Sequence, residues 1–128
     1  AFDSREESDY LPHNYEKNCV VYTGTHDNDT LCGWYKVLDP EDLKLSQKYM
    51  NNANTPKRQI HWDFIRLALA SVADLCIIPL QDYLGLGSEA RINTPSTLGN
   101  NWRWRMTQGC LTKELADQIR ELTTLYGR

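Results

Sequence analysis

The chain has 128 residues, which suits one domain, and it is 41% hydrophobic and 24% charged, as expected of a globular protein. Its net charge is −3 and its basic residues form no cluster, which argues against nucleic acid and anionic membranes as partners. No apolar run approaches the ~18 residues of a membrane-spanning helix. Four cysteines and three histidines are scattered, so we expect free thiols in the cytoplasm, no metal site and no cofactor.

The first half of the chain predicts a strand followed by two helices. A polar loop over residues 4–18 leads into a β-branched and aromatic run at 19–23, which is typical of a strand. Asp39 can cap a helix that runs to about Met50. Apolar residues at helical spacing predict a second helix over residues 59–73.

The second half predicts another strand and a final helix. Residues 75–80 are apolar without alternation, as in a parallel strand covered on both faces. A long polar segment, 81–110, precedes a helix that Thr112 can cap and Gly127 can end. The fold class is therefore α/β. Two parallel strands alone leave open edges, and the chain lacks an initiator Met, so we expect further strands upstream in a longer protein.

Polar residues follow both predicted strands at their carboxyl ends, where barrel and doubly wound enzymes place their sites. The first set, residues 25–30, contains His26 beside Asp27. The alternative for this set is a polar turn that caps a following helix. The second set lacks phosphate-binding and dinucleotide motifs. Its Trp-Arg-Trp-Arg run, residues 102–105, fits either structural packing or a stacking platform for single-stranded nucleic acid, and the acidic chain favours packing.

These segments resemble the amylomaltase (4-alpha-glucanotransferase) family. Residues 20–30, Val-Val-Tyr-Thr-Gly-Thr-His-Asp-Asn-Asp-Thr, followed by Gly33-Trp34, are similar to that family's seventh barrel strand and its loop. The other similar motifs, in the same order as in the family, are residues 1–3, 10–15, 79–95 and 101–105. The resemblance implies a (β/α)8 TIM barrel of the alpha-amylase clan. Residues 1–128 would be its C-terminal segment, from the end of strand six through helix eight.

The resemblance also implies an activity: transfer of 1,4-alpha-glucan segments between maltooligosaccharides with retention of configuration. Retention requires a nucleophilic carboxylate and a second carboxyl group that acts as acid and then base. The family carries these on strands four and five, and neither motif occurs here, so we expect both upstream of Ala1. The alternatives are a hydrolytic relative from the same clan and a non-enzymatic glucan-binding module that uses Trp34, Trp102 and Trp104.

By motif match, Asp27 is the family's third catalytic carboxylate, which binds and distorts the donor sugar. His26 is its neighbour in the same subsite, and Asn93 matches a sugar-contacting Asn of the eighth loop. Asp3 resembles an acid that contacts sugar on the acceptor side. Ser96 stands where the family commonly has Gly, and we expect this difference to affect the loop's backbone rather than its sugar contacts.

Overall fold

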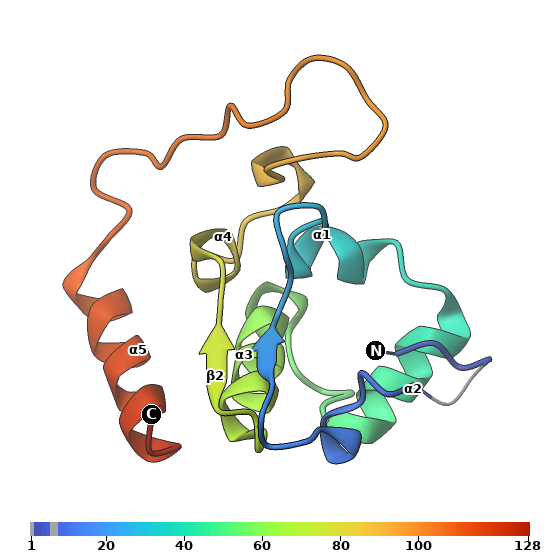
Figure 1. Cartoon of the computed structure of the whole chain (residues 1–128). Helices are drawn as coiled ribbons and strands as arrows, with labels where there is room; N and C mark the ends of the chain where they lie inside the picture. The colour runs from blue at the N-terminus through green and yellow to red at the C-terminus, as the bar shows by residue number, and fades with distance from the viewer. Residues whose placement is uncertain (1, 6–7) are drawn as a thin grey trace.

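The computed structural model describes residues 2–5 and 8–128, so Ala1 of the N-terminal motif lies outside it. Its fold is α/β, with two short parallel strands beside a set of helices (Figure 1). Within the described ranges, no helix is long and apolar enough to cross a membrane. The elements, in chain order, are η1 (Pro12–Asn14), β1 (Val20–Tyr22), α1 (Leu31–Lys36), α2 (Pro40–Met50), η2 (Lys57–Gln59), α3 (Ile60–Ala70), β2 (Leu75–Ile77), α4 (Leu80–Tyr83), η3 (Ser88–Ala90) and α5 (Lys113–Leu125).

The three predicted helices are confirmed, and the two N-caps predicted for them, Asp39 and Thr112, are in place. Asp39 accepts a hydrogen bond from the Glu41 N–H, 3.0 Å away, at the start of α2. Thr112 accepts one from the Leu115 N–H at the start of α5. α3 ends at Ala70, three residues earlier than predicted, because the backbone is already extended at Ser71.

The strands pair as predicted, in parallel, with Val21 opposite Cys76. The coverage on both faces that was predicted for residues 75–80 is not found among the described residues. Val21 packs under α3 against Ala68, but the residues on the other face of both strands are exposed. On β2, Leu75 is 51% and Ile77 41% exposed, so among the described residues only one face of the sheet is covered. β2 is also shorter than predicted, since Pro79 already stands at the N-terminus of α4.

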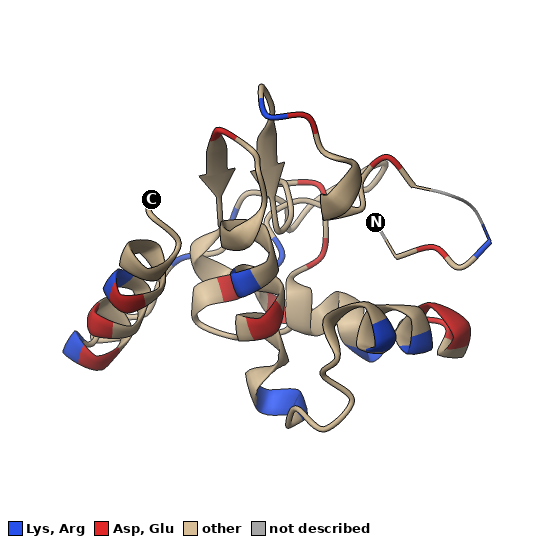
Figure 2. Ribbon diagram, turned by 90° about the horizontal axis from the view of Figure 1, so that it is seen from below, with Lys and Arg blue, Asp and Glu red and all other residues tan. Residues whose placement is uncertain are grey.

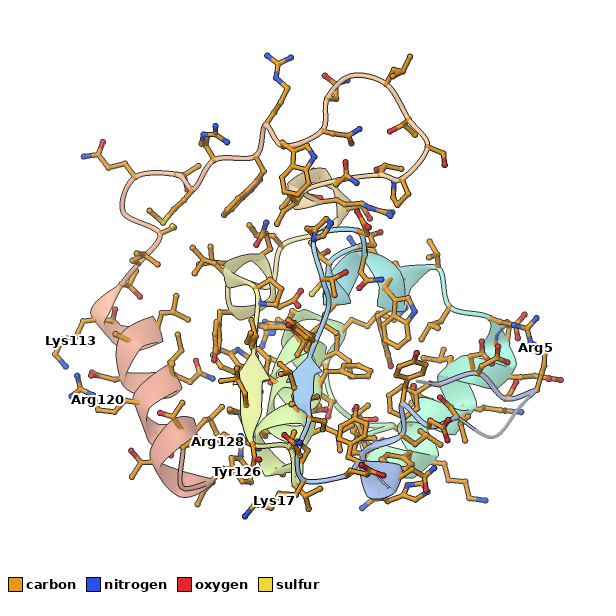
Figure 3. The ribbon with its side chains drawn as sticks, in the orientation of Figure 1. Arg5, Lys17, Lys113, Arg120, Tyr126 and Arg128 are labelled. Carbon is orange, nitrogen blue, oxygen red and sulfur yellow. The ribbon has the colours of Figure 1, made fainter. Side chains whose placement is uncertain are left out.

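The core lies between α3 and its neighbours. Phe64 and Ile65 of α3 are buried together with Leu31 of α1 and Leu122 of α5. Arg128 attaches the C-terminus to α3 (Figure 3). Its guanidinium donates hydrogen bonds to the Leu69 carbonyl within α3 and to the Ser71 carbonyl directly after it. Charges of both signs are interspersed along α5, whereas on α2 the acids lie in the first turn and the lysines follow them (Figure 2).

Candidate functional site

The loop after β1 and the segment after η3 meet above the carboxyl ends of the strands. The Asn93 side-chain amide donates to Asp27 Oδ1 over 2.6 Å, and the Asn93 N–H donates to the His26 carbonyl over 3.1 Å. The Arg91 guanidinium donates to the Asp27 carbonyl over 2.7 Å. Three of the four predicted site residues, Asp27, His26 and Asn93, are therefore in direct contact although 66 positions separate Asp27 from Asn93.

His26 lies between the carboxylate and an aromatic ring. Its Nε2 is 3.3 Å from Asp27 Oδ1, and its ring faces Trp102 at a centroid distance of 5.1 Å. The backbone N–H of Trp102 donates to the Ile92 carbonyl over 2.7 Å, and this hydrogen bond joins the two ends of the loop between them. The side chains of His26 and Asp27 remain 54% and 47% exposed, so both can bind a ligand that carries hydroxyl groups.

The backbone of this segment is left-handed at three non-glycine residues. Trp102 has φ +62°, Ser96 has φ +61° and Asn100 has φ +56°, in the region that costs an L-residue roughly 1–2 kcal/mol and that Asn adopts more readily than other residues. Ser96 thus has a backbone conformation that glycine favours. Strain of this kind persists where surrounding contacts fix the backbone, and the Trp102 contacts to His26 and Ile92 do so here.

The predicted alternative for residues 25–30, a turn that caps a following helix, is confirmed for part of that loop. Thr30 caps α1 by accepting a hydrogen bond from the Gly33 N–H over 3.1 Å. Asn28 Oδ1 accepts from the Thr25 N–H, and Asp29 accepts from the Ser88 hydroxyl over 2.7 Å. The loop is therefore divided, with residues 28–30 building the turn and residues 26–27 presenting exposed side chains.

Asp3 lies apart from the other predicted site residues. Its carboxylate accepts two hydrogen bonds from the Arg5 guanidinium, each 2.8 Å long, and these bonds lower the pKa of Asp3 to about 2. Ser4 donates to Asp42 of α2, and Figure 3 shows Arg5 at that end of the molecule, far from the loop above the strands. Among the described residues, no hydrogen bond or ion pair joins Asp3 to Asp27, so its role stays a prediction.

A hollow of about 1060 Å³ lies between the N-terminal segment and β1. Its lining includes Phe2, Tyr10, Tyr22, Thr25, Asn28, Asp29 and Trp34. It therefore reaches the loop after β1 from the side of Thr25 and Asn28, whereas the Asp27 and Asn93 side chains meet outside it.

Two side chains that shape the site were not predicted from the sequence. Arg91 was present in a matched motif, but only the structure shows that its guanidinium holds the Asp27 carbonyl. Asp82 is 2% exposed and binds both ends of the loop that carries Asp27. In the Trp-Arg-Trp-Arg run, the Trp102 ring lies against His26 but is 58% exposed, and Arg105 donates to the Trp102 and Trp104 carbonyls, so both alternatives for this run stay predictions.

The family model described as 4-alpha-glucanotransferase matches residues 1–112 of this chain. The chain belongs to that family. A 4-alpha-glucanotransferase from Clostridium butyricum is 49% identical over the whole chain, and a chloroplastic/amyloplastic one from Arabidopsis thaliana is 46% identical over the whole chain. Among solved structures, amylomaltase from Streptococcus agalactiae in complex with acarbose aligns with 99% of the chain at 36% identity and a TM-score of 0.91.

The chain spans about a quarter of the length of these glucanotransferases: 26% of the Clostridium protein, 22% of the Arabidopsis protein and 25% of the Streptococcus chain. The family match includes both polar segments that meet at the candidate site, whereas α5, which begins at Lys113, lies beyond it. Family membership thus rests on the part of the chain that carries Asp27 and Asn93.

Proposed function

We propose that this chain forms part of a 4-alpha-glucanotransferase, in which Asp27 is the carboxylate that binds and distorts the donor sugar. The observation that carries this proposal is the 2.6 Å hydrogen bond from Asn93 to Asp27, which joins the carboxyl ends of two parallel strands. An anionic carboxylate at that place opposes the positive charge that develops on the sugar ring during glycosyl transfer.

The geometry suits this role. Asn93 occupies Oδ1 of Asp27 and leaves Oδ2 able to accept from a sugar hydroxyl. His26 Nε2, close to the same carboxylate, can donate to a second sugar oxygen. The nucleophile and the acid/base group of the double displacement would come from other parts of the enzyme. The substrates would be maltooligosaccharides and other alpha-1,4-glucans, in line with acarbose, a maltooligosaccharide analogue, in the similar amylomaltase structure.

We further propose that β1 and β2 are strands seven and eight of a (β/α)8 barrel, of which residues 1–128 form the C-terminal segment. Two observations support this. The exposed face of the sheet, opposite α3, is apolar, as the interior face of a barrel is, and it comprises Val20, Tyr22, Leu75 and Ile77. The polar loops lie at the carboxyl ends of the strands, where barrel enzymes place their sites. The cytoplasmic location stays a prediction, since the Arabidopsis relative is named as chloroplastic/amyloplastic.

The first prediction tests Asp27 in the intact protein that carries this segment. We expect Asp27→Asn to lower the rate of maltotriose disproportionation about 10²- to 10³-fold, because the amide cannot oppose positive charge. Asp74→Asn is the matched control, since Asp74 is exposed at the amino end of β2 and should leave the rate unchanged. Near-normal turnover by Asp27→Asn, with the control also unaffected, would refute the proposed role.

Analysis of the products separates transfer from hydrolysis in the same assay. Transfer yields free glucose together with chains longer than maltotriose, whereas hydrolysis yields a net shortening of all chains. The carboxylates are common to both reactions, so Asp27→Asn lowers either one. A binding module without activity would instead retain glucan affinity and form neither set of products.

A further inference from the structure

Asp82, in the first turn of α4, is a buried carboxylate with two partners from one loop. Its Oδ2 accepts from the Thr23 hydroxyl over 2.6 Å, and its Oδ1 accepts from the Leu31 N–H over 2.8 Å. Thr23 is the last residue before the polar loop 24–30, and Leu31 is the first residue of α1 after it. A single side chain therefore holds both ends of the loop that carries Asp27.

The environment of Asp82 indicates that it acts by holding the loop that carries Asp27, and that it does not contact the substrate. The residue is 2% exposed, so a sugar cannot reach it. Burial raises the pKa of Asp82, while its two hydrogen bonds act in the opposite direction. Burying a carboxyl group costs free energy unless its oxygens are bonded, and here both oxygens are.

Gln81, the residue before Asp82, holds the other segment of the site, the one that leads to Arg91 and Asn93. Gln81 is 4% exposed, and its amide donates to the Ala90 carbonyl over 3.2 Å. Ala90 is the last residue of η3 and directly precedes Arg91, which binds the Asp27 carbonyl. Two adjacent buried side chains on α4 thus hold the two segments whose contact forms the candidate site.

We propose that Asp82 is a positioning residue for Asp27: by fixing Thr23 and Leu31 it keeps the Asp27 carboxylate within reach of Asn93 and of the bound donor sugar. This inference rests on the proposed function. Asp82 does not touch the reacting atoms, and its effect on the rate must pass through Asp27. A displacement of the loop by about 1 Å is enough to cost up to ~100-fold in rate.

The second prediction compares Asp82→Ala with Asp82→Asn in the intact protein, with maltotriose as substrate. Alanine removes both acceptors, and we expect kcat to fall about 10- to 100-fold. Asparagine keeps an oxygen for the Leu31 N–H and offers an amide to the Thr23 hydroxyl, so we expect kcat within about threefold of wild type. A kcat for Asp82→Ala equal to wild type would overturn the proposal.

A double-mutant cycle distinguishes positioning from a general structural role. In an Asp27→Asn background the carboxylate that Asp82 positions is already absent, so we expect Asp82→Ala to change the remaining kcat by less than about twofold. An equal fold-loss in both backgrounds would overturn the proposal and leave Asp82 with a structural role alone. The effect of Asp27→Asn by itself tests the proposed function, so the two failures are distinguishable.

A second pair of variants keeps the test valid if Asp82→Ala does not fold. Thr23→Val removes the hydroxyl that binds Asp82 but preserves the shape of the side chain, and Thr23→Ser keeps the hydroxyl. We expect kcat of Thr23→Val to lie about 3- to 10-fold below that of Thr23→Ser, as for the loss of one hydrogen bond. Equal kcat values for the two variants would contradict the proposal.

Discussion

Single residues determine how closely the segments around the site approach. Gly33 lets α1 lie against the turn at Ser88, because a Cβ there would be 2.4 Å from Ser88 Oγ and 2.6 Å from Asp29 Oδ1. Gly85, with φ +63°, lies against the buried ring of His61, and a Cβ there would be 2.8 Å from His61 Cε1. His61 is thus confined in the core, with Cys32 Sγ 3.9 Å from its Nδ1.

The third prediction concerns the ionisation of His61. Burial lowers its pKa below the ordinary value of 6.5, while nearby Asp63 acts in the opposite direction. A lowered histidine pKa contributes stability that is present above the unfolded value and is lost as the pH falls through the folded value. We therefore expect the melting temperature of the wild type to fall relative to that of His61→Gln as the pH decreases from about 7 to 5.

The measurement is a thermal melt of the wild type and of His61→Gln across that pH range. The difference between their melting temperatures is plotted against pH. Other titrating groups are shared by the two proteins, so the difference isolates His61. Curves that stay parallel from pH 7 to pH 5 would show that His61 keeps an ordinary pKa in the folded state.

At the level of elements, the sequence predicted those whose signals are local. Asp39 followed by Pro40, and Thr112 ahead of an apolar stripe, mark helix starts within one turn, and both helices begin there. α1 was expected only as the helix that would follow a capping turn, and its range was not predicted, because it has only six residues with a glycine among them and its start is held by Asp82, which lies far away in the sequence. β2 was predicted too long because the sequence does not show that Pro79 already belongs to α4.

The difference between local signals and contacts that only the fold creates also explains which parts of the site were predictable. Asp27, His26 and Asn93 stand in motifs that could be matched along the chain, and the structure brings them together. The role of Asp82 depends on side-chain contacts with partners 59 and 51 positions away, and that of Gln81 on a contact with the Ala90 carbonyl nine positions away in an irregular segment. No local pattern encodes such contacts, so only the fold reveals them.

The fourth prediction is made for α5, whose start depends on one hydroxyl. Thr112→Ala removes the acceptor for the Leu115 N–H, and we expect a loss of about 1 kcal/mol in the stability of the helix. Thr112→Ser keeps the hydroxyl and is the control. Hydrogen exchange of the α5 backbone amides in the intact protein measures the effect, and equal protection in the two variants would contradict it.

For the whole molecule, the arrangement of polar and apolar surfaces indicates how the site is supported. α3 covers one face of the two-stranded sheet, and the loops with Asp27 and Asn93 rise from its carboxyl end (Figure 1). The other face presents Tyr22 and Ile77, both more than 40% exposed in this chain. A barrel of the proposed kind covers that face with the side chains of other strands, which would place the site at the rim of a packed core.

The fifth prediction tests this arrangement with two aspartates at exposed positions. Val37, after α1, is 79% exposed, and Ile77 is 41% exposed. In the intact protein we expect Val37→Asp to change the melting temperature little, because a surface substitution rarely costs more than about 0.5 kcal/mol. Ile77→Asp should cost several kcal/mol, because it would place an unpaired charge inside the barrel.

Thermal melts and the yield of folded protein measure both variants side by side. The difference between them matters more than either value, since both replace a β-branched apolar residue by the same acid. If Ile77→Asp were tolerated as well as Val37→Asp, the exposed face of the sheet would be an outer surface, and β1 and β2 could not be adjacent strands of a closed barrel. Loss of folding only in Ile77→Asp would support the barrel on which the proposed position of Asp27 depends.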